Sequence, residues 1–246
     1  MSGLTVTVIG QWGAYPGAGE ACSCYLLQSG GSSVLLDCGS GALSILQNYL
    51  PLSKLDAVIL SHYHADHTAD IGCLQYAALI DMALGSRHGY LPIYGHTESK
   101  DFDSLTYRDC TQGIAFDAAS DLCIGPFTFN FSPTVHPDPC YAIKACTGST
   151  RVVYSADAGF NDSLTDFSRN ADLFICEASL YDANRGMISG HMSSGEAGAM
   201  AREAGAKMLM ITHLPHFGDH AVLLAEAAGA FGGHTVLAAK GLSIEL

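Results

Sequence analysis

Positive charge is scarce in this sequence, and long hydrophobic runs are missing from it. Its 246 residues include 11 Lys and Arg against 24 Asp and Glu, which gives a formal net charge of -13. A surface with this balance repels nucleic acids and anionic membranes. No uncharged apolar run approaches the ~20 residues that a membrane-spanning helix needs. The sequence therefore argues against a large polyanionic partner and against membrane insertion.

Cysteine is present without a pairing pattern. The nine cysteines stand singly among apolar residues, and Cys22 and Cys24 are too close in sequence for an ordinary bridge. We therefore expect small buried thiols of a reducing compartment rather than a disulfide framework. The opening segment, from Met1 to Val8, has no cationic stretch and alternates like a strand, which is not the pattern of a signal peptide. Cytoplasm is the expected location.

The chain also lacks a linker or an internal repeat that would divide it. Because 48% of its residues are hydrophobic and 14% are charged, we expect a single domain with one substantial core over residues 1–246. Apolar runs and turn signals predict strands over 4–9, 24–27, 33–37, 57–60, 127–131, 141–147, 151–155, 173–176, 208–212 and 235–239. Helices are predicted over 70–84 and 220–230. A third helix is predicted between Ser193, which forms a capping box with Glu196, and a stop at Gly205. Both halves run strands first and helices after, which suits two stacked sheets with helices outside.

Four side chains of metal-ligand type crowd one short segment. They follow directly after the apolar run from Ala57 to Leu60 and are His62, His64, Asp66 and His67. A short buried strand would bring this segment to the edge of a sheet, where a loop can turn the side chains toward metal ions. Unrelated surface histidines rarely gather at this spacing, and imidazole with carboxylate suits zinc or a similar first-row ion. The segment therefore predicts half of a two-metal hydrolytic site.

Three further donors follow later in the chain. His136, Asp157 and His213 each come at the carboxyl end of an apolar strand. Taken alone, each would be an ordinary polar residue at a strand end. Appearing together and in this order, they complete the donor set that two metal ions require. Asp37 and Asp70 are interpreted as supporting or turn carboxylates rather than ligands.

With these residues the sequence resembles the metallo-β-lactamase superfamily, whose pattern is H-x-H-x-D-H, then a distant His, an Asp and a final His. Within that superfamily it is most similar to the short-form RNase Z-like hydrolases, because the segments 171–178 and 190–194 match as well. The resemblance covers most of the chain. It implies an α/β fold, the four-layered αβ/βα sandwich.

The resemblance also implies a ligand set for two divalent ions. It assigns His62, His64 and His136 to the first ion, Asp66, His67 and His213 to the second, and Asp157 to both. Zinc is the expected metal, with manganese or iron as alternatives. In such a site a shared hydroxide is the nucleophile, because the ions bring the pKa of water toward ~7.

A catalytic role for His191 and Glu177 comes from the same resemblance. His191 would be a proton donor or oxyanion partner, and Glu177 would orient it. A carboxylate bonded to one ring nitrogen holds the imidazole tautomer and raises its basicity. The alternative is that His191 caps the helix that follows it. Asp66 is counted as catalytic in addition to binding metal.

The likeness departs from RNase Z proper at one place. RNase Z grips tRNA with an extended basic arm between the third His and the bridging Asp. Here the interval from His136 to Asp157 is short, and its basic residues are Lys144 and Arg151. We therefore do not expect tRNA as a substrate; a small phosphodiester such as a cyclic nucleotide is expected instead. No membrane partner is expected, and a homodimer is consistent with the resemblance.

Two other functions stay open at this point. A hydrolase of lactones, thioesters or β-lactams would direct the same nucleophile at a carbonyl carbon. The alternative from another class is a non-catalytic, metal-bound binding module. Degenerate members of such a family usually lose ligands, whereas all the expected positions are filled here.

Overall fold

The computed structural model describes residues 3–246 of the chain. Met1 and Ser2 lie outside the described residues. They belong to the opening segment in which no signal peptide is expected. The chain forms two compact units, each built on its own sheet. The first unit comprises 1–117, 124–126 and 239–245, and the second comprises 118–123, 127–238 and residue 246. The expectation of a single domain stays a prediction.

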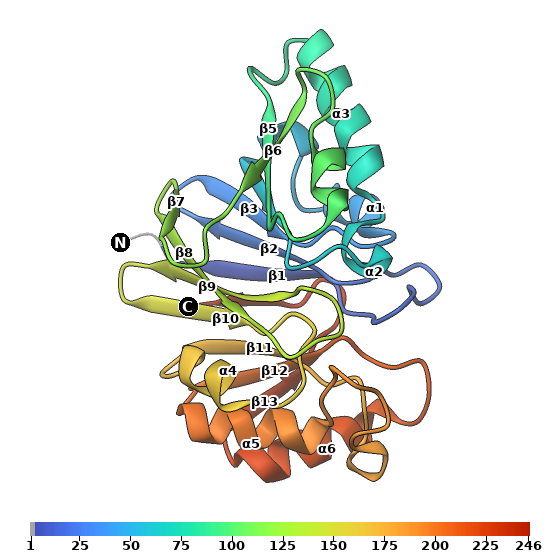
Figure 1. Ribbon diagram of the computed structural model, residues 1–246, viewed down its shortest axis with the longest axis vertical. Helices are drawn as coiled ribbons and strands as arrows, with labels where there is room; N and C mark the ends of the chain where they lie inside the picture. Colours follow the sequence, from blue (N-terminus) through green and yellow to red (C-terminus); the bar gives the residue numbers. More distant parts are fainter. Residues whose placement is uncertain (1–2) are drawn as a thin grey trace. The chain divides into compact units, whose positions relative to one another are not determined.

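A seven-stranded sheet in the order β14-β1-β2-β3-β4-β5-β6 forms the first unit (Figure 1). Its strands are β1 (Thr5–Gly10), β2 (Cys24–Ser29), β3 (Ser32–Leu36), β4 (Ala57–Ile59), β5 (Leu91–Gly95), β6 (Thr111–Ala115) and β14 (Ser243–Glu245). The strands from β3 to β6 pair in parallel, whereas β14, β1, β2 and β3 pair antiparallel. Three helices accompany the sheet: α1 (Ala42–Leu46), α2 (Ala65–Thr68) and α3 (Ile71–Ala83).

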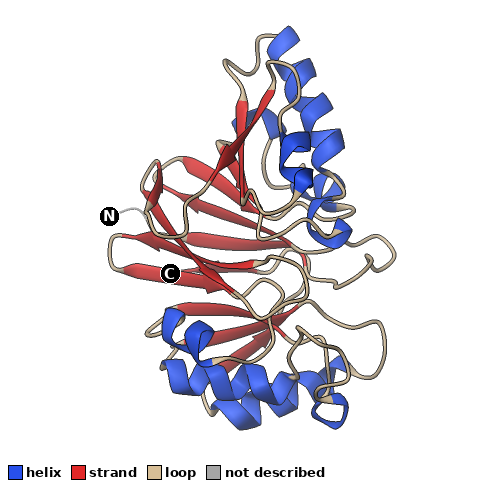
Figure 2. Ribbon diagram, in the orientation of Figure 1, coloured by secondary structure: helices blue, strands red, loops and turns tan. Residues whose placement is uncertain are grey.

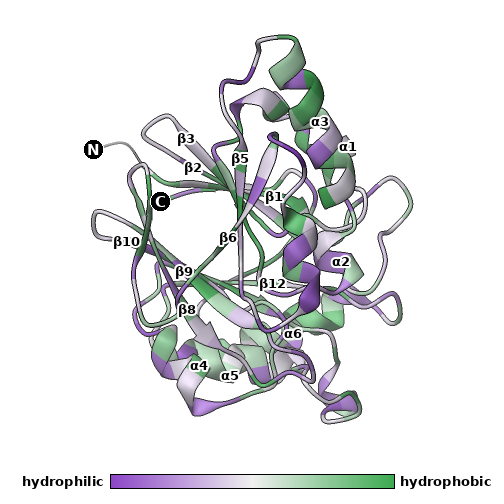
Figure 3. Cartoon of the chain, turned by 45° about the horizontal axis from the view of Figure 1, so that its top comes forward, coloured by the Kyte–Doolittle hydropathy of each residue, from purple (hydrophilic) through white to green (hydrophobic). Residues whose placement is uncertain are grey.

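Helices α1 and α3 supply apolar side chains to the core of the first unit. Leu46 of α1 and Leu74 of α3 belong to one buried cluster with Leu35 and Val58 of the sheet. Burial of such side chains stabilises the packing of helix on sheet by about 1.5 to 3 kcal/mol each. Helix α3 is hydrophobic along most of its length, as the green colouring in Figure 3 shows.

A second seven-stranded sheet, in the order β13-β12-β11-β10-β9-β8-β7, forms the second unit. Its strands are β7 (Leu122–Ile124), β8 (Phe127–Pro133), β9 (Tyr141–Thr147), β10 (Thr150–Tyr154), β11 (Leu173–Glu177), β12 (Met208–Thr212) and β13 (His234–Leu237). Strands β10 to β13 pair in parallel. Helices α4 (Asp162–Phe167), α5 (Ser194–Ala204) and α6 (His220–Phe231) complete the unit (Figure 2). Helices α5 and α6 approach so closely that a Cβ on Gly198 would lie 2.3 Å from the Ala227 carbonyl oxygen.

The helix signals in the sequence are confirmed. Ser193 and Glu196 form the predicted capping box at the start of α5, and Gly205 ends that helix in the left-handed conformation with φ of 64°. Gly85 follows α3 with φ of 73°. Because an L side chain is strained in this region, glycine is favoured at both stops.

Several short elements escaped prediction. The metal-ligand segment was expected to be a loop between a strand and a helix, but α2 forms within it, with His64 at its N-cap position. Four residues are too few for a helical periodicity to appear in the sequence. Strands β5, β6 and β7 and helices α1 and α4 were also missed.

Strand direction places the predicted donors at one edge of each sheet. In the first unit, parallel β3 and β4 end next to each other, just before Asp37 and Ser61. In the second unit, β8 runs antiparallel to β9 and β9 antiparallel to β10, so β8 has the direction of β10, β11 and β12. The carboxyl ends of parallel strands are where open α/β sheets place their binding residues. Between residues 3 and 246, no helix is both long and apolar enough to cross a bilayer.

Candidate metal centre

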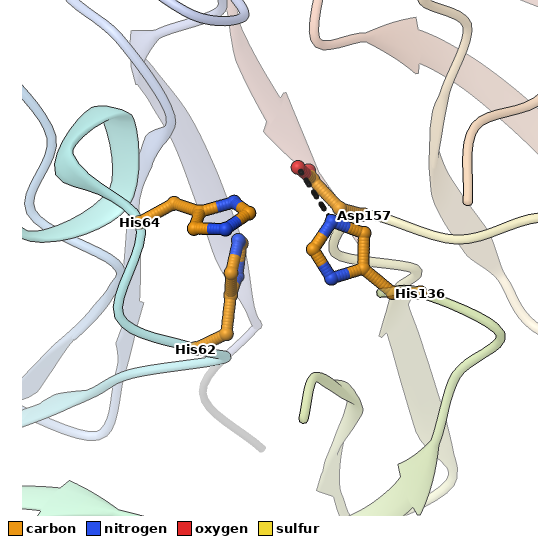
Figure 4. A group of neighbouring side chains, drawn as sticks. All are labelled: His62, His64, His136 and Asp157. Carbon is orange, nitrogen blue, oxygen red and sulfur yellow. Dashed lines mark ion pairs between the residues drawn. The ribbon is translucent and has the colours of Figure 1, made fainter. Parts of the chain in front are cut away.

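In the first unit, strand β4 and helix α2 gather the four clustered donors. Strand β4 is wholly buried and ends just before His62. Helix α2 then carries Asp66 and His67. The ring centroid of His62 lies 4.7 Å from that of His64 and 4.2 Å from that of His67. Figure 4 shows the edge-on arrangement of His62 and His64. The four predicted side chains are therefore neighbours in space as well as in sequence.

One buried carboxylate, Asp37, sets the orientation of two of these imidazoles. Its Oδ2 lies 2.7 Å from Nδ1 of His67 and also accepts a 2.8 Å hydrogen bond from the Ser61 hydroxyl. Because that hydroxyl proton is used, the 3.0 Å contact from Ser61 Oγ to Nδ1 of His62 requires the imidazole to donate. Both rings then carry a lone pair on Nε2, which is the form that binds a metal ion. Asp37 thus has the supporting place expected of it.

The glycine-rich first loop holds Asp66. The backbone N–H of Ala14 donates to Asp66 Oδ2 at 2.7 Å, and Ala14 adopts a left-handed conformation with φ of 64°. Glu20 fixes the loop by accepting hydrogen bonds from Trp12 Nε1 and Gln11 Nε2. No sequence pattern predicts this contact, since any residue except proline can donate a backbone N–H.

In the second unit, Asp157 lies between two histidines. Its Oδ1 is 3.2 Å from His213 Nε2, and its Oδ2 is 4.0 Å from His136 Nε2, the pair marked by the dashed line in Figure 4. Each carboxylate oxygen therefore faces a different imidazole. Asp157 and His213 are 2% and 7% exposed.

Glu177 and His191 form the predicted pair. His191 Nδ1 lies 2.9 Å from Glu177 Oε1, and Glu177 is fully buried at the end of β11. Glu177 also accepts hydrogen bonds from the backbone N–H groups of Ala158 and Ser179. The ring of His191 stacks at 5.5 Å on that of His213. His191 is therefore oriented by Glu177, and the first residue of α5 is capped by Ser193 instead.

Two other histidines make contacts with residues outside this donor set. His220 Nε2 donates a 2.7 Å hydrogen bond to the Pro215 carbonyl oxygen, and the ring centroid of His96 lies 4.8 Å from that of Tyr63. One residue that sequence reasoning missed does reach the site: the hydroxyl of Ser179 lies 2.8 Å from His213 Nδ1. Its only signal was its place two positions after Glu177, just beyond the end of β11.

The donors of each unit suit a metal cation. His67 Nδ1 contacts Asp37, so its Nε2 lone pair faces Asp66 Oδ2 at 3.7 Å. His213 Nε2 faces Asp157 Oδ1 at 3.2 Å. Two acceptors at such distances repel each other unless a cation or a shared proton lies between them. Donor atoms of Glu177, His191 and His213 also lie within 4.8 Å of one another.

Comparison with known proteins decides the family. The Beta-lactamase superfamily domain matches residues 32–214 of this chain. The chain belongs to that superfamily. It is 50% identical over 239 residues to the probable metallo-hydrolase YhfI of Bacillus subtilis, covering 97% of this chain and 98% of that protein.

The crystal structure of YhfI, described as a metallo-beta-lactamase fold protein, superposes with a TM-score of 0.97 at 51% identity, over 99% of this chain and 100% of that one. Ribonuclease Z of Archaeoglobus fulgidus is 24% identical over 98% of this chain and 97% of its own length. The predicted fold class, the α/β sandwich of the metallo-β-lactamase superfamily, is confirmed, and so is the resemblance to RNase Z-like proteins.

Proposed function

We propose that this chain is a binuclear metal-dependent hydrolase that cleaves a small phosphodiester, with both units acting as one catalytic domain. The similarity to a probable metallo-hydrolase over nearly the whole chain supports the hydrolase class. A ribonuclease cleaves phosphodiester bonds, so the similarity to ribonuclease Z supports the bond type.

Seven side chains make up the proposed metal site. One ion is assigned to His62, His64 and His136, the other to Asp66, His67 and His213, and Asp157 is shared. Support comes from the acceptor pairs within each unit, where His67 faces Asp66 and His213 faces Asp157. Zinc is the favoured metal, with manganese or iron also suited to these donors. When bound, such ions lower the pKa of water and so supply the nucleophile.

The observation that carries the choice of bond is the Glu177 and His191 pair. A departing alkoxide is a strong base and needs a proton, and His191 can supply one from Nε2 while Glu177 holds Nδ1 at 2.9 Å. The buried carboxylate stabilises the protonated imidazole before transfer. Stacking of His191 on His213 keeps this acid beside a metal donor. Hydrolysis of a reactive carbonyl ester has less need of such an acid.

The hairpin between His136 and Asp157 bears on substrate size. Strands β9 and β10 occupy more than half of this interval and are joined by a tight turn at Gly148, which has φ of 58°. A basic arm therefore has no place in it, and the net charge of -13 disfavours a long polyanion. This supports a small phosphodiester rather than tRNA.

Parallel assays test the proposal. The metal-loaded protein is given bis(4-nitrophenyl) phosphate, a cyclic nucleotide, a chromogenic lactone and a cephalosporin. We expect turnover of the phosphodiesters that is abolished by a chelator and restored by metal. Turnover of the lactone or cephalosporin without phosphodiester turnover would reassign the bond to a carbonyl ester. Bound metal without any turnover would instead indicate a binding module.

A further inference from the structure

The hydroxyl of Ser179 is the meeting point of three groups in the second unit. It lies 2.7 Å from Glu177 Oε2, 2.8 Å from His213 Nδ1 and 3.3 Å from His191 Nδ1. Ser179 follows β11 by two residues and is only partly exposed. A hydroxyl has one proton to donate and two lone pairs that accept.

Donor counting settles the direction of these bonds. If the hydroxyl donated to His213, its lone pairs would face the Glu177 carboxylate at 2.7 Å, and two acceptors would repel. The proton therefore goes to Glu177, the charged acceptor at 2.7 Å, rather than to the His213 carbonyl oxygen at 3.4 Å. His213 Nδ1 must then carry a hydrogen and donate to the hydroxyl oxygen. His191 directs its own Nδ1 hydrogen to the nearer Glu177 Oε1 at 2.9 Å.

From this geometry we infer that Ser179 is a positioning residue that fixes the tautomer of His213. With hydrogen on Nδ1, His213 presents the Nε2 lone pair toward Asp157, the state in which imidazole binds a cation. The same hydroxyl joins His213 to the Glu177 and His191 pair, so one short network orients a metal donor and the proton donor together. The inference rests on the proposed function for its metal, but the tautomer itself is a property of the metal-free protein.

Three variants test the inference. Ser179→Ala removes the hydroxyl, whereas Ser179→Thr retains it on a similar side chain. Ser168→Ala is the matched control, because Ser168 is a fully buried serine of the same unit at the end of α4. Thermal unfolding of all three shows whether each variant is folded before the site is assayed.

Two readouts are needed. Imidazole nitrogen NMR of the metal-free protein reports the His213 tautomer, and chelator competition reports metal affinity without substrate. We expect the Nδ1–H tautomer in the wild type and in Ser179→Thr, and its loss in Ser179→Ala. We also expect Ser179→Ala to lower the affinity for one of the two metal ions by about 10 to 100-fold, as is typical when a partner of a metal ligand is removed. Ser168→Ala should match the wild type in both.

An unchanged tautomer in Ser179→Ala would overturn the inference, as would wild-type affinity for both ions. If the wild-type protein binds no divalent metal, the proposed function fails instead, and the tautomer readout still decides the role of Ser179.

Discussion

Asp37 Oδ2 lies 2.7 Å from Nδ1 of His67, with both side chains fully excluded from solvent. Asp37 follows β3 and His67 lies in α2, so the contact joins two elements 30 residues apart in sequence. Through Ser61 the same carboxylate also orients His62. One buried residue therefore orients two of the proposed metal donors, His67 directly and His62 through Ser61.

Asp37→Asn tests whether Asp37 orients these two donors. Asparagine tolerates the left-handed conformation of this position, where φ is 55°, so the backbone is preserved. The lost negative charge and the altered hydrogen-bond pattern should weaken metal binding by about 10 to 100-fold. Chelator competition measures the effect. Asp56→Asn is the matched control. Asp37 accepts a 2.7 Å hydrogen bond from the Ser61 backbone N–H, and Asp56 accepts one of the same length from Ser33 at the opposite end of β4. Equal losses in the two variants would contradict the assigned role of Asp37.

His191→Ala separates proton donation from metal binding. We expect turnover of a phosphodiester with a poor leaving group to fall by about 10² to 10⁴-fold, the usual contribution of a general acid. Metal analysis should still find two ions per chain, since His191 is not one of the proposed ligands. A substrate with a good leaving group, such as 4-nitrophenolate, should be affected less because it needs less protonation. Equal effects on both substrates would remove the general-acid assignment.

Gly190 tests the close packing around His136. A Cβ at Gly190 would lie 2.5 Å from Pro137 Cδ and 3.1 Å from His136 Cδ2, so Gly190→Ala should displace a proposed ligand. Gly186→Ala is a stringent control: Gly186 has a similar φ of 76° but nothing within 4 Å of its added Cβ. In both variants, backbone strain should lower the free energy of unfolding by about 1 to 2 kcal/mol. Urea unfolding should show a larger loss for Gly190→Ala, and only that variant should also lose metal affinity.

The ends of these apolar strands could be predicted from sequence, and with them the donors that follow. His62 follows the apolar run from Ala57 to Leu60, and His213 follows the run from Met208 to Thr212. Both were therefore predicted as donors at strand ends. The contacts that orient these donors could not be predicted. Ser179 was missed, because an isolated Ser after a strand is too common to carry a signal. Asp37 was expected to support the site, but its contact with His67 forms only when segments distant in sequence come together. Strand β14 was missed for the same reason, because its pairing partner β1 stands at the other end of the sequence.

The cysteines give a prediction that does not depend on metal. All nine are free thiols, of which Cys73 and Cys123 are exposed. Burial raises the pKa of Cys24, Cys38 and Cys176 well above the usual thiol value, so these stay protonated at mildly alkaline pH. Because the thiolate is the reactive form, a disulfide reagent should modify Cys73 and Cys123 first and the buried thiols only on unfolding. The Cys73→Ser, Cys123→Ser double variant should lose the fast phase; its persistence would show that buried thiols become accessible in the folded protein.

Metal titration of the chelated protein tests the central claim most directly. Zinc or manganese is added in steps while bound metal and bis(4-nitrophenyl) phosphate hydrolysis are measured on the same samples. We expect activity to rise with metal and to level off at two bound ions per chain. Saturation at one ion, or two bound ions without phosphodiester hydrolysis, would contradict a binuclear phosphodiesterase.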